Sequence, residues 1–161
     1  AKLKYKKMKK NVLLLLVAVF YGCKSNPTTS LDKKTEVGMK GNWVISSVTY
    51  PGSEVIKVNS FEIADSQCFV GSEWRFISNN NKGTMALTRS NCPAFSSPIT
   101  WYVNKEGNFV MKVLDAGEKA KRVTGGYQFI LENPTTNTFT LMQTVNADGK
   151  PMSIRYNFVR K

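Results

Sequence analysis

The side chains able to carry chemistry are few in this chain of 161 residues, which has three cysteines and no histidine. Without histidine, Ser-His and Cys-His catalysis, histidine-ligated zinc and the usual proton shuttle near neutral pH are excluded. The acidic residues are scattered, and Glu62 and Asp65 are the only close pair within a predicted strand and its exit. No glycine-rich phosphate loop leads from a strand into a helix. We therefore expect a binding protein without a cofactor rather than an enzyme.

The net charge of +12 comes from 23 basic and 11 acidic residues, and half of the excess lies near the N-terminus. A strong positive charge is typical of proteins that bind nucleic acids. The first 22 residues contain no acid, however, and hold the six lysines at positions 2, 4, 6, 7, 9 and 10. Since the remainder carries a net charge of only +6, we expect no nucleic-acid partner.

The N-terminal segment has the pattern of a signal peptide, because an unbroken apolar run over residues 12–20 follows the lysines directly. As a helix this run would cover about 14 Å, against about 30 Å for the hydrocarbon core of a bilayer. It is too short to span a membrane. Met8 is a candidate start, since Met8-Lys9-Lys10 would by itself supply the basic region.

Shortly after the apolar run, Gly22-Cys23 resembles the cleavage site of bacterial lipoproteins. This resemblance implies a signal peptide over residues 1–22, a lipidated Cys23 as the mature N-terminus, and a membrane anchor. The polar residues that follow predict a flexible tether over residues 23–40. We expect an exported lipoprotein of the cell envelope, in the outer membrane. The alternative is an ordinary secretory peptide with an incidental cysteine.

Assigning Cys23 to the lipid leaves Cys68 and Cys92 as an even pair in an oxidising compartment. We predict a disulfide between them, which would stabilise the fold by about 3.5 kcal/mol through loop closure. The alternative is a metal site. Zinc would need two further ligands, and without histidine only carboxylates remain, so no metal is expected.

Short segments rich in β-branched and aromatic residues recur along the rest of the chain, separated by turns that contain Gly, Pro, Asn or Asp. This pattern predicts an all-β domain over residues 41–161. The predicted strands cover residues 42–50, 55–63, 73–78, 82–89, 98–104, 108–115, 124–132, 136–145 and 151–159. Short helices are expected only over residues 65–70 and 115–122.

Within most of these strands apolar and polar residues alternate, so that Trp74 and Phe76 share one face while Arg75 lies on the other. Sequential hairpins with one apolar face must bury it in a sandwich or a closed barrel. Because the connections are short and sequential, we predict an antiparallel up-and-down barrel of eight to nine strands.

Gly41-Asn42-Trp43, at the head of the first strand, resembles the Gly-x-Trp motif of the lipocalins. In that family the tryptophan closes the base of an eight-stranded barrel beneath a basic residue. Arg155 or Arg160 could supply this residue, and we assign the role to Arg155 together with Gly41 and Trp43. The second lipocalin motif, Thr-Asp-Tyr, is absent.

The chain is also similar to small bacterial lipoproteins with a lipocalin-like domain. The similarity rests on the segments over residues 68–76, 92–93, 117–121 and 156–158, together with Trp101. It implies a barrel that binds or carries a small hydrophobic ligand.

The inward-facing aromatic and methionine residues are the expected lining of such a pocket. They are Trp74, Phe76, Met85, Trp101, Phe109, Met111, Tyr127, Phe129 and Tyr156. A barrel of eight strands can equally be filled by its own side chains. The alternative is therefore an interaction or inhibitor module of the cell envelope with a filled barrel and no small-molecule ligand.

Overall fold

The structure is a computed structural model that describes residues 32–54, 57–115 and 125–161. The predicted signal peptide, Cys23, most of the tether and nearly all of the predicted helix over residues 115–122 lie outside these ranges. In the described ranges, no helix has the length and hydropathy needed to cross a bilayer.

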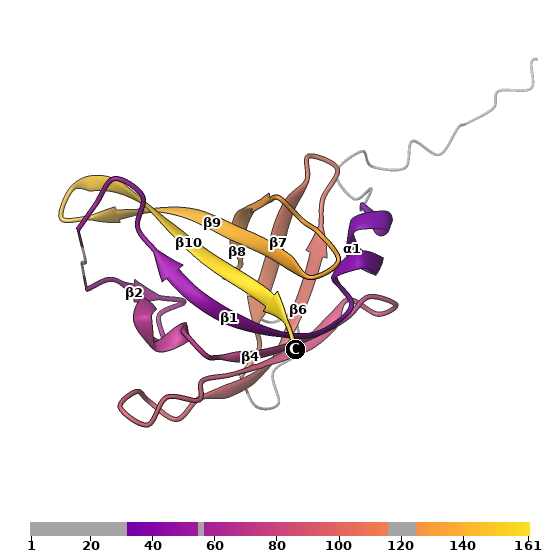
Figure 1. The fold of residues 1–161 in the computed structure, drawn as a ribbon, viewed down its shortest axis with the longest axis horizontal. Coiled ribbons are helices and arrows are strands. Elements are labelled where there is room, and N and C mark those ends of the chain that lie inside the picture. Colours follow the sequence, from indigo (N-terminus) through magenta and orange to yellow (C-terminus); the bar gives the residue numbers. More distant parts are fainter. Residues whose placement is uncertain (1–31, 55–56, 116–124) are drawn as a thin grey trace, which may run out of the picture.

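Eight strands form a closed antiparallel barrel, which confirms the predicted fold class (Figure 1). Each strand from β4 to β10 pairs with the next one along the chain, and β1 closes the ring between β10 and β4. The strands are β1 (Gly41–Thr49), β4 (Glu73–Ile77), β5 (Lys82–Ala86), β6 (Ser96–Val103), β7 (Asn108–Val113), β8 (Tyr127–Glu132), β9 (Thr138–Ala147) and β10 (Lys150–Arg160). We call the end where β1 begins the base and the end where β1 finishes the upper end.

The alternation of residue types in the strands decides which side chains enter the barrel. In β4, Trp74 and Phe76 are buried whereas Glu73 and Arg75 are exposed. The register continues this arrangement across the wall, because Trp74 lies opposite Trp43 of β1 on one side and Met85 of β5 on the other. Neighbouring strands thus place large apolar side chains at the same level inside.

The domain begins before residue 41, so the prediction of a flexible tether up to residue 40 is wrong for its last part. Residues Lys33–Met39 form helix α1, in which Asp32 is the N-cap and its side chain accepts a hydrogen bond from the Thr35 N–H. Glu36 and Met39 of this helix are fully buried against the base of the barrel. Polar composition predicted a solvated segment, but two residues one turn apart provide a buried face.

The predicted strand over residues 55–63 is also wrong. From residue 57 on, the described part of this segment forms two short strands, β2 (Asn59–Ser60) and β3 (Ala64–Asp65), which pair with each other and not with the barrel. The 3₁₀ helix η2 (Ser66–Phe69) follows directly, within the helix predicted over residues 65–70. Figure 1 shows this segment at one end of the barrel and α1 at the other.

The predicted disulfide between Cys68 and Cys92 is confirmed. Its Cα atoms lie 5.7 Å apart, and it links η2 to the loop between β5 and β6. The bridge therefore fixes the end of the long β1–β4 connection to the β5–β6 loop at the upper end.

Candidate functional site

The nine residues predicted to line a pocket do face the interior, where eight are buried and Tyr127 is half-buried. Their rings are in contact with one another rather than separated by open space. Near the base, Phe76 lies 5.0 Å from Trp101 and 5.8 Å from Phe109 between ring centroids. Phe139 and Phe158 complete this lower layer, with their rings stacked at 4.4 Å. The lower half of the barrel is thus a packed core.

The upper half of the barrel contains an additional ring that no wall strand supplies, that of Phe61. Phe61 belongs to the turn between β2 and β3, and its side chain is 8% exposed. Five aromatic rings surround it at centroid distances of 4.9 to 6.3 Å. They are Phe69, Trp74, Tyr127, Phe129 and Tyr156. A loop side chain therefore occupies the space that four of the predicted pocket residues enclose.

The turn that carries Phe61 has an unfavourable backbone conformation. Phe61 and Glu62 have φ angles of 57° and 58°, and the turn is closed by a hydrogen bond of 3.0 Å from the Ile63 N–H to the Ser60 carbonyl. Positive φ at both central positions suits a tight hairpin turn, but it favours Gly or Asn over bulky residues. Placing the Phe61 ring in the barrel therefore costs backbone strain of roughly 1–2 kcal/mol per residue.

One hydrogen bond links the β2–β3 hairpin to the barrel wall in the described part of the chain. It joins the Ser60 hydroxyl and the Tyr156 hydroxyl at 2.5 Å. The adjoining η2 is held far more firmly, by the disulfide and by hydrogen bonds from the Gln67 amide to the Val48 carbonyl and the Tyr50 hydroxyl. The upper end thus combines a fixed helix with a weakly attached hairpin.

The polar groups inside the upper end form a small cluster at the margin of the aromatic rings. Tyr156 is 1% exposed, and burial raises the pKa of its phenol well above the ordinary value, with only a partial opposing effect from Ser60. The Tyr50 hydroxyl is hydrogen-bonded to the hydroxyl of buried Ser66. An apolar space with a few convergent polar groups is the usual construction of a small-molecule site.

The mouth of the upper end carries acidic groups. The pKa of Tyr127 is raised, mainly by burial and then by the nearby carboxylates of Glu62 and Asp115. Glu62 and Asp65, the acidic pair of the sequence, have different structural roles. Glu62 lies in the β2–β3 turn, whereas Asp65 caps η2 by accepting a 2.9 Å hydrogen bond from the Gln67 N–H. Within the described ranges, no three Cys, Asp or Glu side chains come together as a metal site would require.

The base is closed by Trp43 and Arg160, so the assignment of Arg155 is wrong. The Arg160 guanidinium lies 4.3 Å from the Trp43 ring centroid. Arg155 instead forms an ion pair of 2.8 Å with Glu132 on the outer wall. On β10 the inward positions include Ile154, Tyr156 and Phe158, so Arg155 points outward.

Gly41 is required for this closure. A Cβ atom at this position would lie 2.6 Å from Nη1 of Arg160, and the backbone φ of 128° disfavours other residues. Arg160 donates further hydrogen bonds to the carbonyls of Gly38, Lys40 and Thr136 at 2.5 to 2.9 Å. The Gly-x-Trp pattern thus has a physical reason in this protein.

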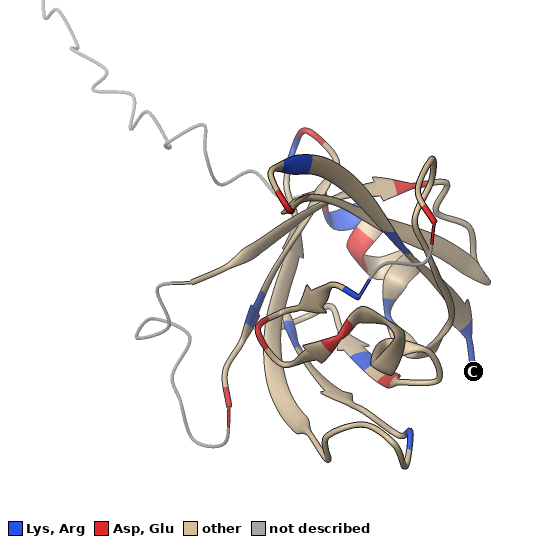
Figure 2. Ribbon diagram, turned by 90° about the vertical axis from the view of Figure 1, so that its left-hand side faces the viewer, with Lys and Arg blue, Asp and Glu red and all other residues tan. Residues whose placement is uncertain are grey.

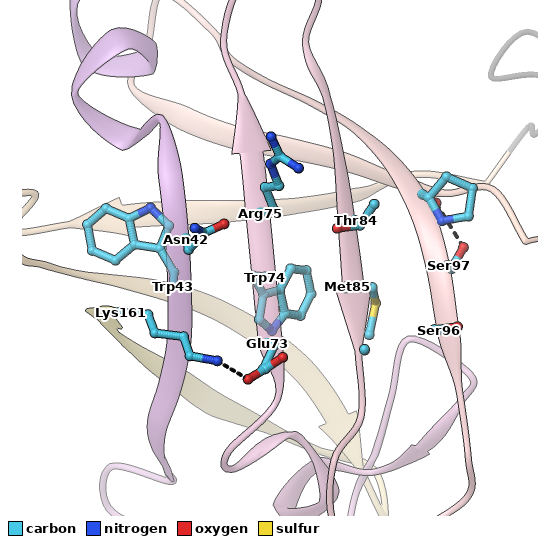
Figure 3. A pocket seen from close by; sticks show the side chains of 12 residues that line it. Asn42, Trp43, Glu73, Trp74, Arg75, Thr84, Met85, Ser96, Ser97 and Lys161 are labelled. Carbon is cyan, nitrogen blue, oxygen red and sulfur yellow. Dashed lines mark hydrogen bonds and ion pairs between the residues drawn. The ribbon is translucent and has the colours of Figure 1, made fainter.

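A hollow of about 830 Å³ lies along the outer wall over β1, β4, β5 and β6 (Figure 3). Its outward lining consists of Asn42, Glu73, Arg75, Thr84, Ala86, Ser96, Pro98 and Lys161. Glu73 is neutralised by an ion pair with Lys161, and both side chains are exposed. Charged positions of both signs are distributed around the barrel (Figure 2). Exposed charges bind weakly, so we place the candidate site inside the upper end.

The sequence analysis missed Phe61 and Ser60 because it assigned residues 55–63 to a wall strand, and it missed Ser66 and Phe69 because it gave the helix predicted over residues 65–70 no part in the site. The residue pattern of the segment over residues 55–63 did not fit a wall strand. Residues 55, 57, 59, 61 and 63 read Val, Lys, Asn, Phe and Ile, so neither face of a strand would be uniformly apolar or polar.

Comparisons of the chain with protein-family models, with curated proteins and with solved structures found no match, so the function must be argued from the geometry of the barrel itself.

Proposed function

We propose that this protein is a lipocalin-like lipoprotein, anchored through Cys23, that binds a small hydrophobic molecule in the upper half of its barrel. The ligand takes the place of the Phe61 ring. It enters when the β2–β3 hairpin moves out of the upper end while η2 stays attached through its disulfide. The protein binds or carries its ligand and catalyses no reaction.

One observation carries this proposal: the ring at the centre of the upper half comes from a loop and not from the wall. A residue that serves only to fill a core needs no strained turn, whereas Phe61 and Glu62 are both held at positive φ. The hairpin is joined to the wall by the Ser60–Tyr156 bond, so its removal exposes few unsatisfied polar groups. The five rings around Phe61 would then line an apolar pocket.

The experiment is a titration of the full chain carrying Cys23→Ser, which cannot be acylated, with retinol and with long-chain alcohols. Trp74, whose ring centroid lies 6.3 Å from Phe61, should report binding by a saturable change in tryptophan emission. Hydrogen exchange on the complex should show faster exchange of the amides over residues 57–65. Exchange in β1 should be unchanged.

Phe61→Ala should bind the same compounds more tightly, because the competing ring is gone. Phe139→Leu is the matched control, since it alters a ring of the lower layer next to Trp43 at the base. Saturable binding that leaves exchange over residues 57–65 unchanged would contradict the proposed site. The absence of binding to both the parent chain and Phe61→Ala would contradict the function.

The second candidate is an interaction module with a filled barrel, and the outer wall of β8 and β9 favours it. Here Ile130 is 51% exposed and lies opposite Met142. A shallow hollow of about 400 Å³ runs beside them, and its lining contains no charged residue. We choose a second copy of the chain as the partner to be tested. Sedimentation of the parent and of Ile130→Lys would test it, since the variant should be monomeric.

A further inference from the structure

We propose that the ligand of the upper end is electrically neutral and carries a flat apolar ring with one hydroxyl or carbonyl group, and that Tyr156 is the residue that recognises this polar group. This inference rests on the proposed function and specifies its ligand. It excludes carboxylates such as fatty-acid anions.

The shape requirement follows from what the ligand replaces. Phe61 presents a planar ring to five aromatic neighbours, and its contact with Tyr127 is edge-to-face at 5.1 Å with an interplanar angle of 78°. Tilted and edge-to-face pairs of this kind contribute beyond the area that they bury. A flat ring in the same place would keep these contacts, whereas a flexible alkyl chain would keep only the apolar burial.

The single polar group follows from the hydrogen bond that is broken when the hairpin leaves. Ser60 is 3% exposed and Tyr156 is 1% exposed, and each is the hydrogen-bond partner of the other. Once Ser60 is withdrawn into solvent, the Tyr156 hydroxyl remains buried without a partner, which is unfavourable. A ligand hydroxyl or carbonyl at the position of the Ser60 hydroxyl would restore the bond. The phenol can donate or accept, so either group is suitable.

The neutrality requirement follows from the charges that surround the upper end. Among the described residues, every Lys and Arg side chain is at least partly exposed, so none provides a buried cation for a carboxylate. The charged groups whose effect reaches Tyr127 are the carboxylates of Glu62 and Asp115. The raised pKa of Tyr156 agrees with a dry surrounding that disfavours anions. In the part of the chain that the structure describes, an anionic ligand would find no buried counterion to replace the hydration that it loses.

Three probes of the same shape test the proposal by calorimetry on the full chain carrying Cys23→Ser at neutral pH. They are naphthalene, 2-naphthol and the 2-naphthoate anion. We expect 2-naphthol to bind about five to ten times more tightly than naphthalene, the gain from one hydrogen bond. We expect 2-naphthoate to bind at least about a hundred times more weakly than 2-naphthol.

Tyr156→Phe separates recognition from mere burial. The affinity for 2-naphthol should fall to that for naphthalene, while the affinity for naphthalene should not decrease. Ser60→Ala is the second variant, because it removes the bond that holds the hairpin and leaves Tyr156 in place. All neutral probes should then bind about fivefold more tightly, with the preference for 2-naphthol retained.

Two results would overturn the inference alone: 2-naphthoate binding as tightly as 2-naphthol, or an unchanged preference for 2-naphthol in Tyr156→Phe. In both cases the barrel would still be a binding protein. If none of the three probes binds to the parent chain or to Ser60→Ala, the proposed function itself fails.

Discussion

The two ends of this barrel are closed by opposite means. At the base, several hydrogen bonds join backbone groups to buried side chains or to other backbone groups. Glu36 accepts a 3.0 Å bond from the Val103 N–H, and the Val103 carbonyl accepts a 2.8 Å bond from the Asp32 N–H. The Trp43 indole donates a 2.8 Å bond to the Met39 carbonyl. The base is therefore closed by a network of hydrogen bonds between fixed elements of the fold.

At the upper end, η2 is fixed by the disulfide and by side-chain hydrogen bonds, but among the described residues the β2–β3 hairpin is held to the barrel wall by apolar contact and a single hydrogen bond. This hairpin pairs only with itself, and it places the Phe61 ring inside at positive φ. Positive φ also occurs at Asn81 and Asn133 in turns at the base, but a bulky residue such as Phe61 adopts it at a greater steric cost. Under the proposed function, the base maintains the fold while the upper end admits the ligand. The following variants, from the largest expected effect to the smallest, test this contrast.

Trp43→Ala should destabilise the protein most, by about 3–5 kcal/mol, because it empties a large buried site at the base. It also removes the support of the Arg160 guanidinium and the bond to Met39. The free energy of unfolding from urea denaturation measures the loss. Phe61→Ala should cost less, since the hairpin can shift to reduce the cavity. Equal losses at the two positions would contradict a difference between the ends.

Replacing both cysteines, Cys68→Ser with Cys92→Ser, should lower the free energy of unfolding by about 3.5 kcal/mol, because the bridge joins residues 24 positions apart in the sequence. Hydrogen exchange should accelerate over residues 57–72 and remain slow in α1. Uniform acceleration throughout the barrel would show that the bridge supports the whole fold and not the upper end in particular.

Arg160→Met should cost about 1–2 kcal/mol, since it removes the contact over Trp43 and three bonds to backbone carbonyls. Arg155→Met is the matched control on the same strand, because it loses only an outer ion pair with Glu132. Its effect on thermal unfolding should be clearly smaller. A larger loss for Arg155→Met would restore Arg155 as the closing residue.

Asp32→Ala should cost about 1 kcal/mol at neutral pH, because it removes the N-cap of α1. The Thr35 side chain, and then its N–H, lower the pKa of Asp32 below its ordinary value of 3.8. The stabilisation is therefore complete above pH 3.8 and is lost as the pH falls through the lower folded pKa. Urea titrations at pH 7 and pH 2 check this. A pH-independent difference would speak against the charged cap.

Glu62→Gly should have the smallest effect and the opposite sign, a stabilisation of less than about 1 kcal/mol, because glycine adopts positive φ without steric cost. By favouring the closed hairpin it should also weaken ligand binding slightly, by no more than about fivefold. Denaturation and titration of the same sample would test both effects. A variant that is more stable yet binds more tightly would contradict a hairpin that competes with the ligand.

Much of the fold could be predicted from the sequence because alternation is a local property. Trp74 and Phe76 had to share a face, and sequential turns had to produce neighbouring strands, so the barrel followed. The disulfide followed from the even pair of cysteines that remained once Cys23 was assigned to a lipid. These inferences need no knowledge of which residues meet across the barrel.

The candidate site depended on contacts that only the tertiary structure establishes. The alternation of residue types in β10 predicts that Tyr156 faces inward. It does not predict that Phe61 fills the space in front of Tyr156. The strand pattern likewise could not decide between Arg155 and Arg160, since this choice depends on where β10 ends relative to Trp43. Glu36 is a charged residue and yet is buried. Its carboxylate accepts the hydrogen bond of the Val103 N–H, a buried backbone donor at the base that needs an acceptor. Sequence thus determined the wall of the barrel, and closure in three dimensions decided what occupies its two ends.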